Sequence, residues 1–163
     1  MINTRLLLLD GTLLTLIFSA FVGFTIWWKP RMWLHDFPQD IQDRVPPKTA
    51  AEKRLTNLVS IPFSILLFGG LGLTAFRFGL DNGLLATMFH VYLVWQVVNV
   101  FDLIVIDWGG MYLIDPQNPP FPGTEGAKGY RDYKFHLLGF LKGSVIGLVL
   151  APVIVGILWV LVR

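Results

Sequence analysis

Apolar residues run along the chain in four long blocks, and the block from Leu84 to Trp108 carries polar side chains inside it. About 20 apolar residues at about 1.5 Å each cover the hydrocarbon core of a bilayer, so each block is long enough to span one. The pattern predicts helices at about 6–28, 50–78, 84–108 and 135–162, joined by long loops at 29–49 and 109–134. The sequence therefore predicts an all-α protein, a single domain over 1–163, folded as a bundle of four transmembrane helices.

Local signals mark two of the helix ends. Thr49 and Glu52 have the spacing of a capping box directly after two prolines, which places the start of the second helix near Ala50. Gly109 and Gly110 weaken the helical pattern, and four prolines follow within the next dozen residues. The third helix is therefore predicted to end at the boundary with these glycines.

The third predicted helix carries a polar stripe. Tyr92, Gln96, Asn99 and Asp102 follow one another at steps of four, three and three residues, which puts them on one face of a helix. An ionisable group inside a membrane helix costs roughly 2.5 to 3.5 kcal/mol on insertion scales, so Asp102 needs a partner and is a candidate functional residue. The stripe is expected to face other protein or a water-filled cavity.

Two other predicted helices carry a small residue at every fourth position. The first has Gly11, Thr15, Ser19 and Gly23, and the last has Gly139, Gly143, Gly147 and Ala151. Small side chains let membrane helices approach closely. These stripes are expected to pack on the central pair of helices or on each other.

Composition narrows the classes of function. Apolar residues make up 54% of the 163 residues and cysteine is absent, which excludes disulfides, thiolate metal sites, iron–sulfur clusters and thiol catalysis. A net charge of +2 is too small to indicate nucleic-acid binding. The expected partners are membrane lipids and either a second copy of the chain or another membrane protein.

Basic residues concentrate in the two long loops and their borders. They are Lys29, Arg31, Arg44, Lys48, Lys53, Arg54, Lys128, Arg131 and Lys134. Because loops rich in Lys and Arg stay on the cytoplasmic side, both long loops are predicted to be cytoplasmic and both termini to lie outside.

Depth along antiparallel helices predicts two polar layers. With the facing ends of the third and fourth helices at one interface, Lys142 matches the depth of Asp102, and His136 matches that of Asp107. The outer layer is expected to contain Asp10, Arg77 and His90. The Asp102–Lys142 pair has two open interpretations, charge compensation alone or a site that handles protons or a lipid head group.

Reactive side chains are dense around the entrance to the last helix. His136 is suited to act as a general acid or base oriented by Asp107, and it is equally suited to be an interfacial anchor. The candidate catalytic residues are Asp102, Asp107, His136, Lys142, Glu125, Tyr130, Arg131 and Asn99.

A metal site is a weaker hypothesis. Asp36, Asp40 and Asp43 resemble in spacing the aspartates that hold magnesium and diphosphate in membrane prenyltransferases. Pro38 separates the first two and Arg44 follows the third, which favours solvated charge balance. Two helical histidines fall in opposite layers, so a bis-histidine haem is not expected, and neither a metal nor a cofactor is predicted.

Four segments carry a resemblance. HDFPQDIQ, VPPKTAAEKR, NVFDLIVIDW and PGTEGAKGYRDYKFH resemble segments of a group of uncharacterised small four-span bacterial inner-membrane proteins. The resemblance covers roughly residues 33–142 and implies a multi-pass protein of the bacterial inner membrane. It also implies that the two long loops and the polar end of the third helix form one surface, and it implies no reaction or ligand.

Three functions stay open. The favoured one is a non-catalytic membrane subunit or assembly factor, which the packing stripes and the lack of a recognised catalytic motif indicate. The second is a small intramembrane enzyme that acts on a lipid or isoprenoid head group at the cytoplasmic interface. The third is a component of a proton-linked carrier, with Asp10 and His90 on the outer side and Asp102 on the inner side.

Overall fold

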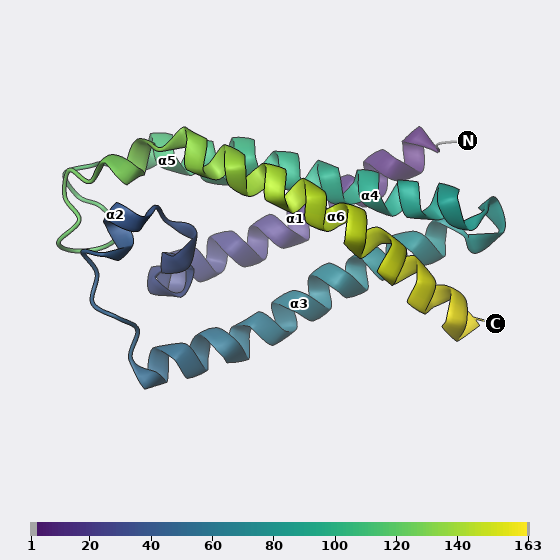
Figure 1. Cartoon of the computed structure of the whole chain (residues 1–163), viewed down its shortest axis with the longest axis horizontal. Coiled ribbons are helices and arrows are strands. Elements are labelled where there is room, and N and C mark those ends of the chain that lie inside the picture. Colours follow the sequence, from purple (N-terminus) through teal and green to yellow (C-terminus); the bar gives the residue numbers. More distant parts are fainter. Residues whose placement is uncertain (1–2, 163) are drawn as a thin grey trace.

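The computed structural model describes residues 3–162, and its regular structure in that range is entirely helical. Four helices are long and apolar enough to cross a membrane: α1 (Thr4–Trp28), α3 (Ala50–Phe78), the continuous helix Leu84–Leu113 and α6 (Tyr133–Val162). They form an elongated bundle with both termini at one end and the two long loops at the other (Figure 1). We call these the termini end and the loop end. The predicted all-α class and the four apolar helices are confirmed.

The third span is longer than predicted. It consists of α4 (Leu84–Phe101), the π-helix η3 (Asp102–Trp108) and α5 (Gly109–Leu113). The prediction that the helix stops before Gly109 was wrong, because a glycine lowers helix stability by only about 1 kcal/mol and packing readily compensates for that. The backbone becomes extended only at Ile114, two residues before a proline.

Local chemistry fixes the ends of α3. Thr49 and Glu52 form the predicted capping box, in which the Glu52 backbone N–H donates to Thr49 Oγ1 at 3.2 Å and the Thr49 N–H donates to Glu52 Oε2 at 2.7 Å. At the other end, Gly79 and Gly83 have φ values of 89° and 94°, which other residues rarely adopt. They flank the short turn η2 (Leu80–Asn82), which reverses the chain into α4.

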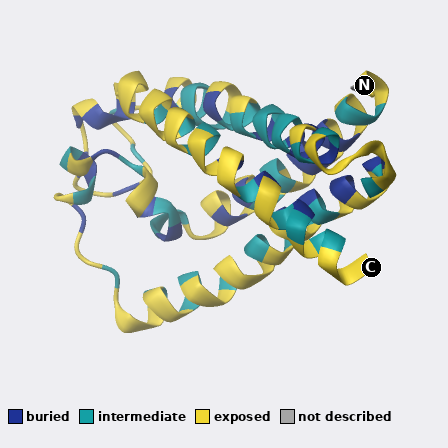
Figure 2. Ribbon diagram, turned by 45° about the vertical axis from the view of Figure 1, so that its right-hand side comes forward, coloured by how far each residue is buried: buried dark blue, intermediate teal, exposed yellow. Residues whose placement is uncertain are grey.

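The core lies around α4, which packs against α1, α3 and α6. Buried apolar side chains from all four helices meet there, including Leu14, Leu71, Val94 and Val155. Figure 2 shows that buried residues gather where the helices cross toward the termini end, whereas the half of α3 next to the loops is mostly exposed. Exposed apolar side chains on long helices are what a lipid environment requires.

The small-residue stripes pack as predicted for only some of their members. A Cβ atom on Gly143 would lie 2.8 Å from Asn99 Oδ1, and one on Gly11 would lie 2.9 Å from Val97 Cγ1, so both glycines permit close contact with α4. Gly23 and Gly139 have open space where a Cβ atom would lie. Close helix contact is therefore made at Gly11 in the first stripe and at Gly143 in the last, and it does not extend along the whole of either stripe.

The two long loops fold against each other into a small second core, which we call the loop cap. It contains η1 (Pro30–Asp36), α2 (Gln39–Gln42) and η4 (Lys128–Arg131). Its buried residues are Leu34, Ile41, Val45, Phe121, Ala127 and Tyr130. Asp40 Oδ2 accepts a hydrogen bond from the Gly129 N–H at 2.9 Å, which ties the first loop to the third.

Candidate functional site

A histidine and an aspartate meet where the third and fourth spans reach the loop end. His136 Nδ1, from the first turns of α6, lies 3.0 Å from Asp107 Oδ2, from η3. The two side chains are 11% and 27% exposed, so solvent reaches the pair only partly. No hydrogen bond to the rest of residues 3–162 occupies His136 Nε2. The predicted match in depth between these two residues is confirmed.

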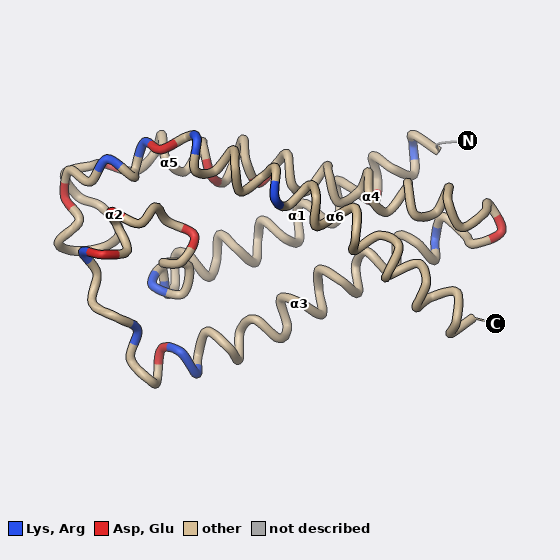
Figure 3. Tube along the Cα trace, in the orientation of Figure 1, with Lys and Arg blue, Asp and Glu red and all other residues tan. Residues whose placement is uncertain are grey.

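Two further carboxylates lie within electrostatic range of this pair. Asp102 lies within electrostatic range of Asp107, Asp36 and His136. Asp36 comes from the loop cap, and its Oδ2 lies 3.3 Å from His35 Nε2. The site thus combines three carboxylates and His136 from the first loop, the third span and the fourth span. Figure 3 shows charged residues gathered mostly at the loop end of the molecule.

The surroundings of Asp36 raise the pKa of its carboxyl group. About half of its side chain is exposed, yet the surrounding protein removes enough water to raise the pKa of its carboxyl group above the ordinary value. His35 opposes this rise and Asp107 adds to it. Desolvation and a like charge therefore both favour the neutral form of Asp36.

The π-helix explains how Asp102 and Asp107 reach one site. In an α-helix of 3.6 residues per turn, residues five apart point about 140° away from each other. A π-turn closes with i→i+5 hydrogen bonds, which brings residues five apart close to the same face. The segment Asp102–Trp108 therefore places Asp102 closer to the face of Asp107, which contacts His136, and within electrostatic range of that histidine. The sequence offered no signal for this change of helix type.

Lys142 does not pair with Asp102, which corrects the prediction. Its side chain is exposed, and no ion pair joins the two residues in the part of the chain that the structure describes. The contact between α6 and α4 passes through the next residue, Gly143, and neighbouring residues on a helix point about 100° apart. The rotation of α6 that brings Gly143 against Asn99 turns Lys142 away from α4.

The polar stripe of α4 faces α6. Asn99 Nδ2 donates to the Phe140 carbonyl oxygen at 3.1 Å and lies 3.1 Å from Ser144 Oγ. Gln96 Nε2 donates to the Tyr92 hydroxyl at 2.6 Å, and Gln96 Oε1 accepts from Ser144 at 3.2 Å. The expectation that this stripe faces protein is confirmed, and Asn99 is a part of helix packing.

Three candidate residues belong to the loop cap instead of the carboxylate site. Tyr130 is 1% exposed, and its hydroxyl lies 2.7 Å from Thr124 Oγ1; burial raises the pKa of this phenol. Arg131 donates to the Ile114 carbonyl oxygen at 3.0 Å, which caps the end of α5. Glu125 Oε1 accepts from a backbone N–H at 3.0 Å, and this bond lowers the pKa of its carboxyl group.

The aspartates of the first loop separate from one another. Asp40 is bonded to Gly129, and Asp43 Oδ1 accepts a hydrogen bond from Gln39 Nε2 at 2.7 Å. Only Asp36 reaches the carboxylate site. Over residues 3–162, no three His, Asp or Glu side chains come together in a way that could hold a metal ion.

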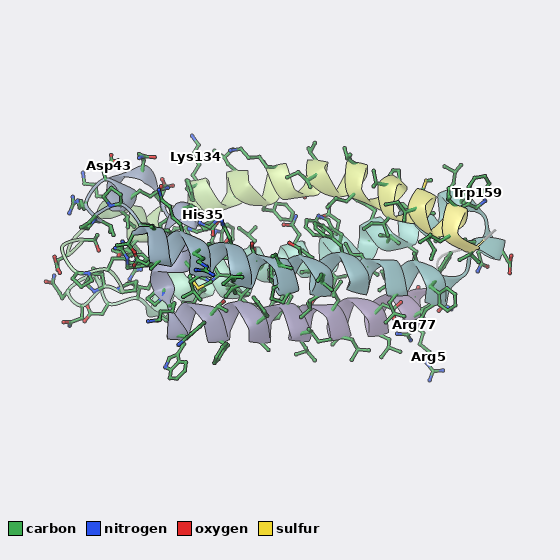
Figure 4. All side chains as sticks on the ribbon, turned by 90° about the horizontal axis from the view of Figure 1, so that it is seen from below. Arg5, His35, Asp43, Arg77, Lys134 and Trp159 are labelled. Atoms are coloured by element: carbon green, nitrogen blue, oxygen red, sulfur yellow. The ribbon has the colours of Figure 1, made fainter. Side chains whose placement is uncertain are left out.

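A second ionisable cluster lies near the termini end and joins three helices. Arg77 Nη1 lies 2.5 Å from Asp10 Oδ1, and His90 Nε2 lies 3.3 Å from Asp10 Oδ2. Asp10 and His90 are each 2% exposed, and the His90 ring stacks on Phe78 at a centroid distance of 4.5 Å. Figure 4 shows Arg77 far from the loop-end residues His35 and Asp43. The predicted separation into two layers is confirmed.

The polar stripe is satisfied by contacts within the protein. In the outer cluster, His90 Nδ1 has no hydrogen-bond partner among residues 3–162, but this nitrogen is buried away from any ligand. The open Nε2 of His136 belongs to a side chain that is 11% exposed, and the ring contacts Asp107 within electrostatic range of Asp102 and Asp36. The loop-end group Asp36, Asp102, Asp107 and His136 is therefore the candidate site. Comparison with known proteins adds no assignment, because no family model, curated protein or solved structure matches this chain.

Proposed function

We propose that the protein is a small multi-pass membrane enzyme that performs acid–base chemistry on the polar head of a lipid or isoprenoid. The observation that supports this proposal is the contact of His136 Nδ1 with Asp107, while Nε2 has no hydrogen-bond partner among residues 3–162. A carboxylate at Nδ1 fixes the orientation and tautomer of an imidazole, which leaves Nε2 to take up or release a proton. In this scheme His136 is the acid–base residue and Asp107 is its positioning residue.

The location of the pair supports a lipid head group as the substrate. His136 follows the first residue of α6 by one turn, at the level where a membrane helix enters the interface. Trp108 and Tyr133 pack there at a centroid distance of 5.9 Å, and such aromatic residues are typical of the membrane–water boundary. A head group of the same leaflet can therefore approach Nε2 without leaving the membrane.

Charge narrows the kind of head group. Asp36, Asp102 and Asp107 surround the site, and an anionic substrate without a bound cation would be repelled by them. The raised pKa of Asp36 lessens this charge without removing it. The arrangement favours an uncharged or cationic head group, such as an alcohol or an amine.

Orientation and location are part of the same proposal. The excess of Lys and Arg in the loops supports cytoplasmic loops and both termini outside. With this orientation the carboxylate site faces the cytoplasmic leaflet. A bacterial inner-membrane address fits the sequence resemblance, and membrane lipids are then the immediate partners.

Quantitative lipid analysis of cells tests the proposal. Strains that express the wild type, His136→Gln or Asp107→Asn are compared with a strain that expresses Asp81→Asn, a matched carboxylate change at the termini end. We expect one class of lipid or isoprenoid to accumulate in the His136→Gln and Asp107→Asn strains, and not in the wild type or in Asp81→Asn. Identical lipid profiles in all four strains at equal protein levels would refute an enzymatic role.

A non-catalytic subunit is the second candidate, and one observation favours it. The buried Tyr130 and the capping Arg131 stabilise an ordered loop cap, which is a surface suited to hold a partner protein. Purification in mild detergent, followed by mass spectrometry of whatever accompanies the chain, distinguishes the two. A stoichiometric protein partner that survives His136→Gln would support the subunit and contradict the enzyme.

A further inference from the structure

A cavity of about 610 Å³ lies at the loop end, apart from the carboxylate site. Its walls come from the end of α1 with the first residues of η1, from the start of α3, and from the prolines around Phe121 in the third loop. None of the residues of the carboxylate site lines it. A volume of this size is within the range of pockets that bind small organic ligands, about 300 to 1,000 Å³.

The lining is apolar with a cationic edge. Trp28, Leu55 and Pro122 provide apolar surface, and Lys29 and Arg31 provide positive charge. Lys29 is exposed, and its ammonium group forms no hydrogen bond or ion pair with another residue of the described chain. A ligand that complements both the apolar walls and the cationic edge is therefore an amphiphile with a negative charge at one end.

Arg31 is fixed by contacts within the protein, but its guanidinium still has N–H groups that can donate to a ligand. Its Nε donates to Glu52 Oε1 at 2.6 Å, and its Nη2 donates to the Pro46 carbonyl oxygen at 2.9 Å. Within residues 3–162, Nη1 has no hydrogen-bond acceptor. Because Glu52 neutralises only one of the two cations, the cavity keeps a net positive charge. A guanidinium fixed by two contacts is well suited to bind a phosphate oxygen with its remaining N–H groups.

The position of the cavity matches the membrane surface. Trp28 is the last residue of α1 and is 43% exposed, and Leu55 and Thr56 lie where α3 enters its apolar part. Apolar walls at this height can receive the upper part of an acyl chain, while the cations lie at the depth of phosphates. Basic pockets between membrane helices are a known way to bind anionic lipid head groups.

We propose that this cavity binds one anionic phospholipid of the leaflet at the loop end, with its phosphate between Lys29 and Arg31. The apolar wall formed by Trp28, Leu55 and Pro122 holds the glycerol and the first methylene groups. This binding site is independent of the acid–base site, because the two share no residue. A bound lipid at this point would tie the start of α3 to the end of α1.

The test uses the full-length protein in nanodiscs of phosphatidylcholine with increasing phosphatidylglycerol, and native mass spectrometry counts the bound lipid. The variants are Lys29→Gln, which removes an exposed charge, and Thr56→Phe, which fills the cavity. Lys53→Gln is the matched control, because Lys53 is an exposed basic residue that does not line the cavity. Thermal unfolding of each variant shows that it is folded before it is compared.

We expect the wild type to retain one phosphatidylglycerol in preference to phosphatidylcholine. Lys29→Gln should weaken this binding about fivefold, Thr56→Phe should abolish it, and Lys53→Gln should leave it unchanged. Equal retention of the two lipids, or equal weakening by Lys29→Gln and Lys53→Gln, would overturn the proposal. Displacement by millimolar inorganic phosphate would show a simple anion site and would also overturn it. His136→Gln should bind the lipid normally, which separates this result from the fate of the proposed enzyme.

Discussion

A single methyl group added to α6 tests how the last helix packs. Gly143→Ala places a Cβ atom 2.8 Å from Asn99 Oδ1 and 3.3 Å from its Nδ2, whereas Gly139→Ala, one turn away, meets no atom within 4 Å. Asn99 cannot easily move aside, because it is bonded to the Phe140 carbonyl oxygen and to Ser144. The two variants therefore add the same methyl group, at Gly143 where it meets Asn99 and at Gly139 where there is space for it.

The magnitude follows from three contributions. Overpacking costs about 2 kcal/mol, and one weakened interhelical hydrogen bond adds about 0.6 kcal/mol. Alanine offsets this by about 1 kcal/mol because it is the better helix former. We expect Gly143→Ala to lower the free energy of unfolding by about 1.5 kcal/mol and Gly139→Ala to raise it by up to about 1 kcal/mol.

Unfolding in mixed micelles of a mild detergent and sodium dodecyl sulfate measures both variants against the wild type. The expected difference between them is about 2.5 kcal/mol, which is well above the error of such titrations. If Gly143→Ala proved as stable as Gly139→Ala, the close contact between α6 and α4 would be refuted, and with it the reason for the outward rotation of Lys142.

Three other predictions concern the termini end, the loop cap and the topology. Asp10→Asn should lower the free energy of unfolding by about 2 to 3 kcal/mol, because it leaves a partly buried guanidinium without its counter-ion, while Asp81→Asn should change it little; the same micelle titration compares them. The raised pKa of Asp36 means that its carboxyl group contributes stability below the ordinary Asp pKa of 3.8 and that this contribution is lost as pH rises through the higher value of the folded state. The hydrogen-exchange protection factors of the loop cap, which correct for the base-catalysed intrinsic rate, should therefore fall over that range in the wild type and stay constant in Asp36→Asn. Cysteines placed at Lys48 or Lys128 should react with an impermeant reagent only after the membrane is opened, and labelling in intact cells would reverse the proposed orientation.

Features that depend on local chemistry or on helical periodicity were predictable from the sequence. The Thr49–Glu52 capping box and the four apolar helices depend on residues close together in the chain. The polar stripe could be assigned to a protein-facing side, because an unpaired amide in lipid is costly wherever the neighbouring helix lies. Antiparallel counting also brought His136 to Asp107.

Features that depend on rotation or on contacts between distant segments were not predictable. Depth counting fixes the height of Lys142 but not the direction in which it points, which the close approach at Gly143 decides. The π-helix and the arrival of Asp36 depend on how the loop cap settles against the third span. Tyr130 was a reasonable candidate for chemistry until the fold buried it against Thr124.

The acid–base site is tested most directly by nitrogen NMR of the histidine rings. The chain has 3 histidines, so His35→Gln and His90→Gln assign the signals of His136 by elimination. We predict that the neutral His136 ring carries its proton on Nδ1, held by Asp107, with Nε2 as the free acceptor, and that Asp107→Leu shifts the proton to Nε2. Identical ring nitrogen shifts in the wild type and in Asp107→Leu would show that the carboxylate does not orient the ring, and would contradict the proposed site.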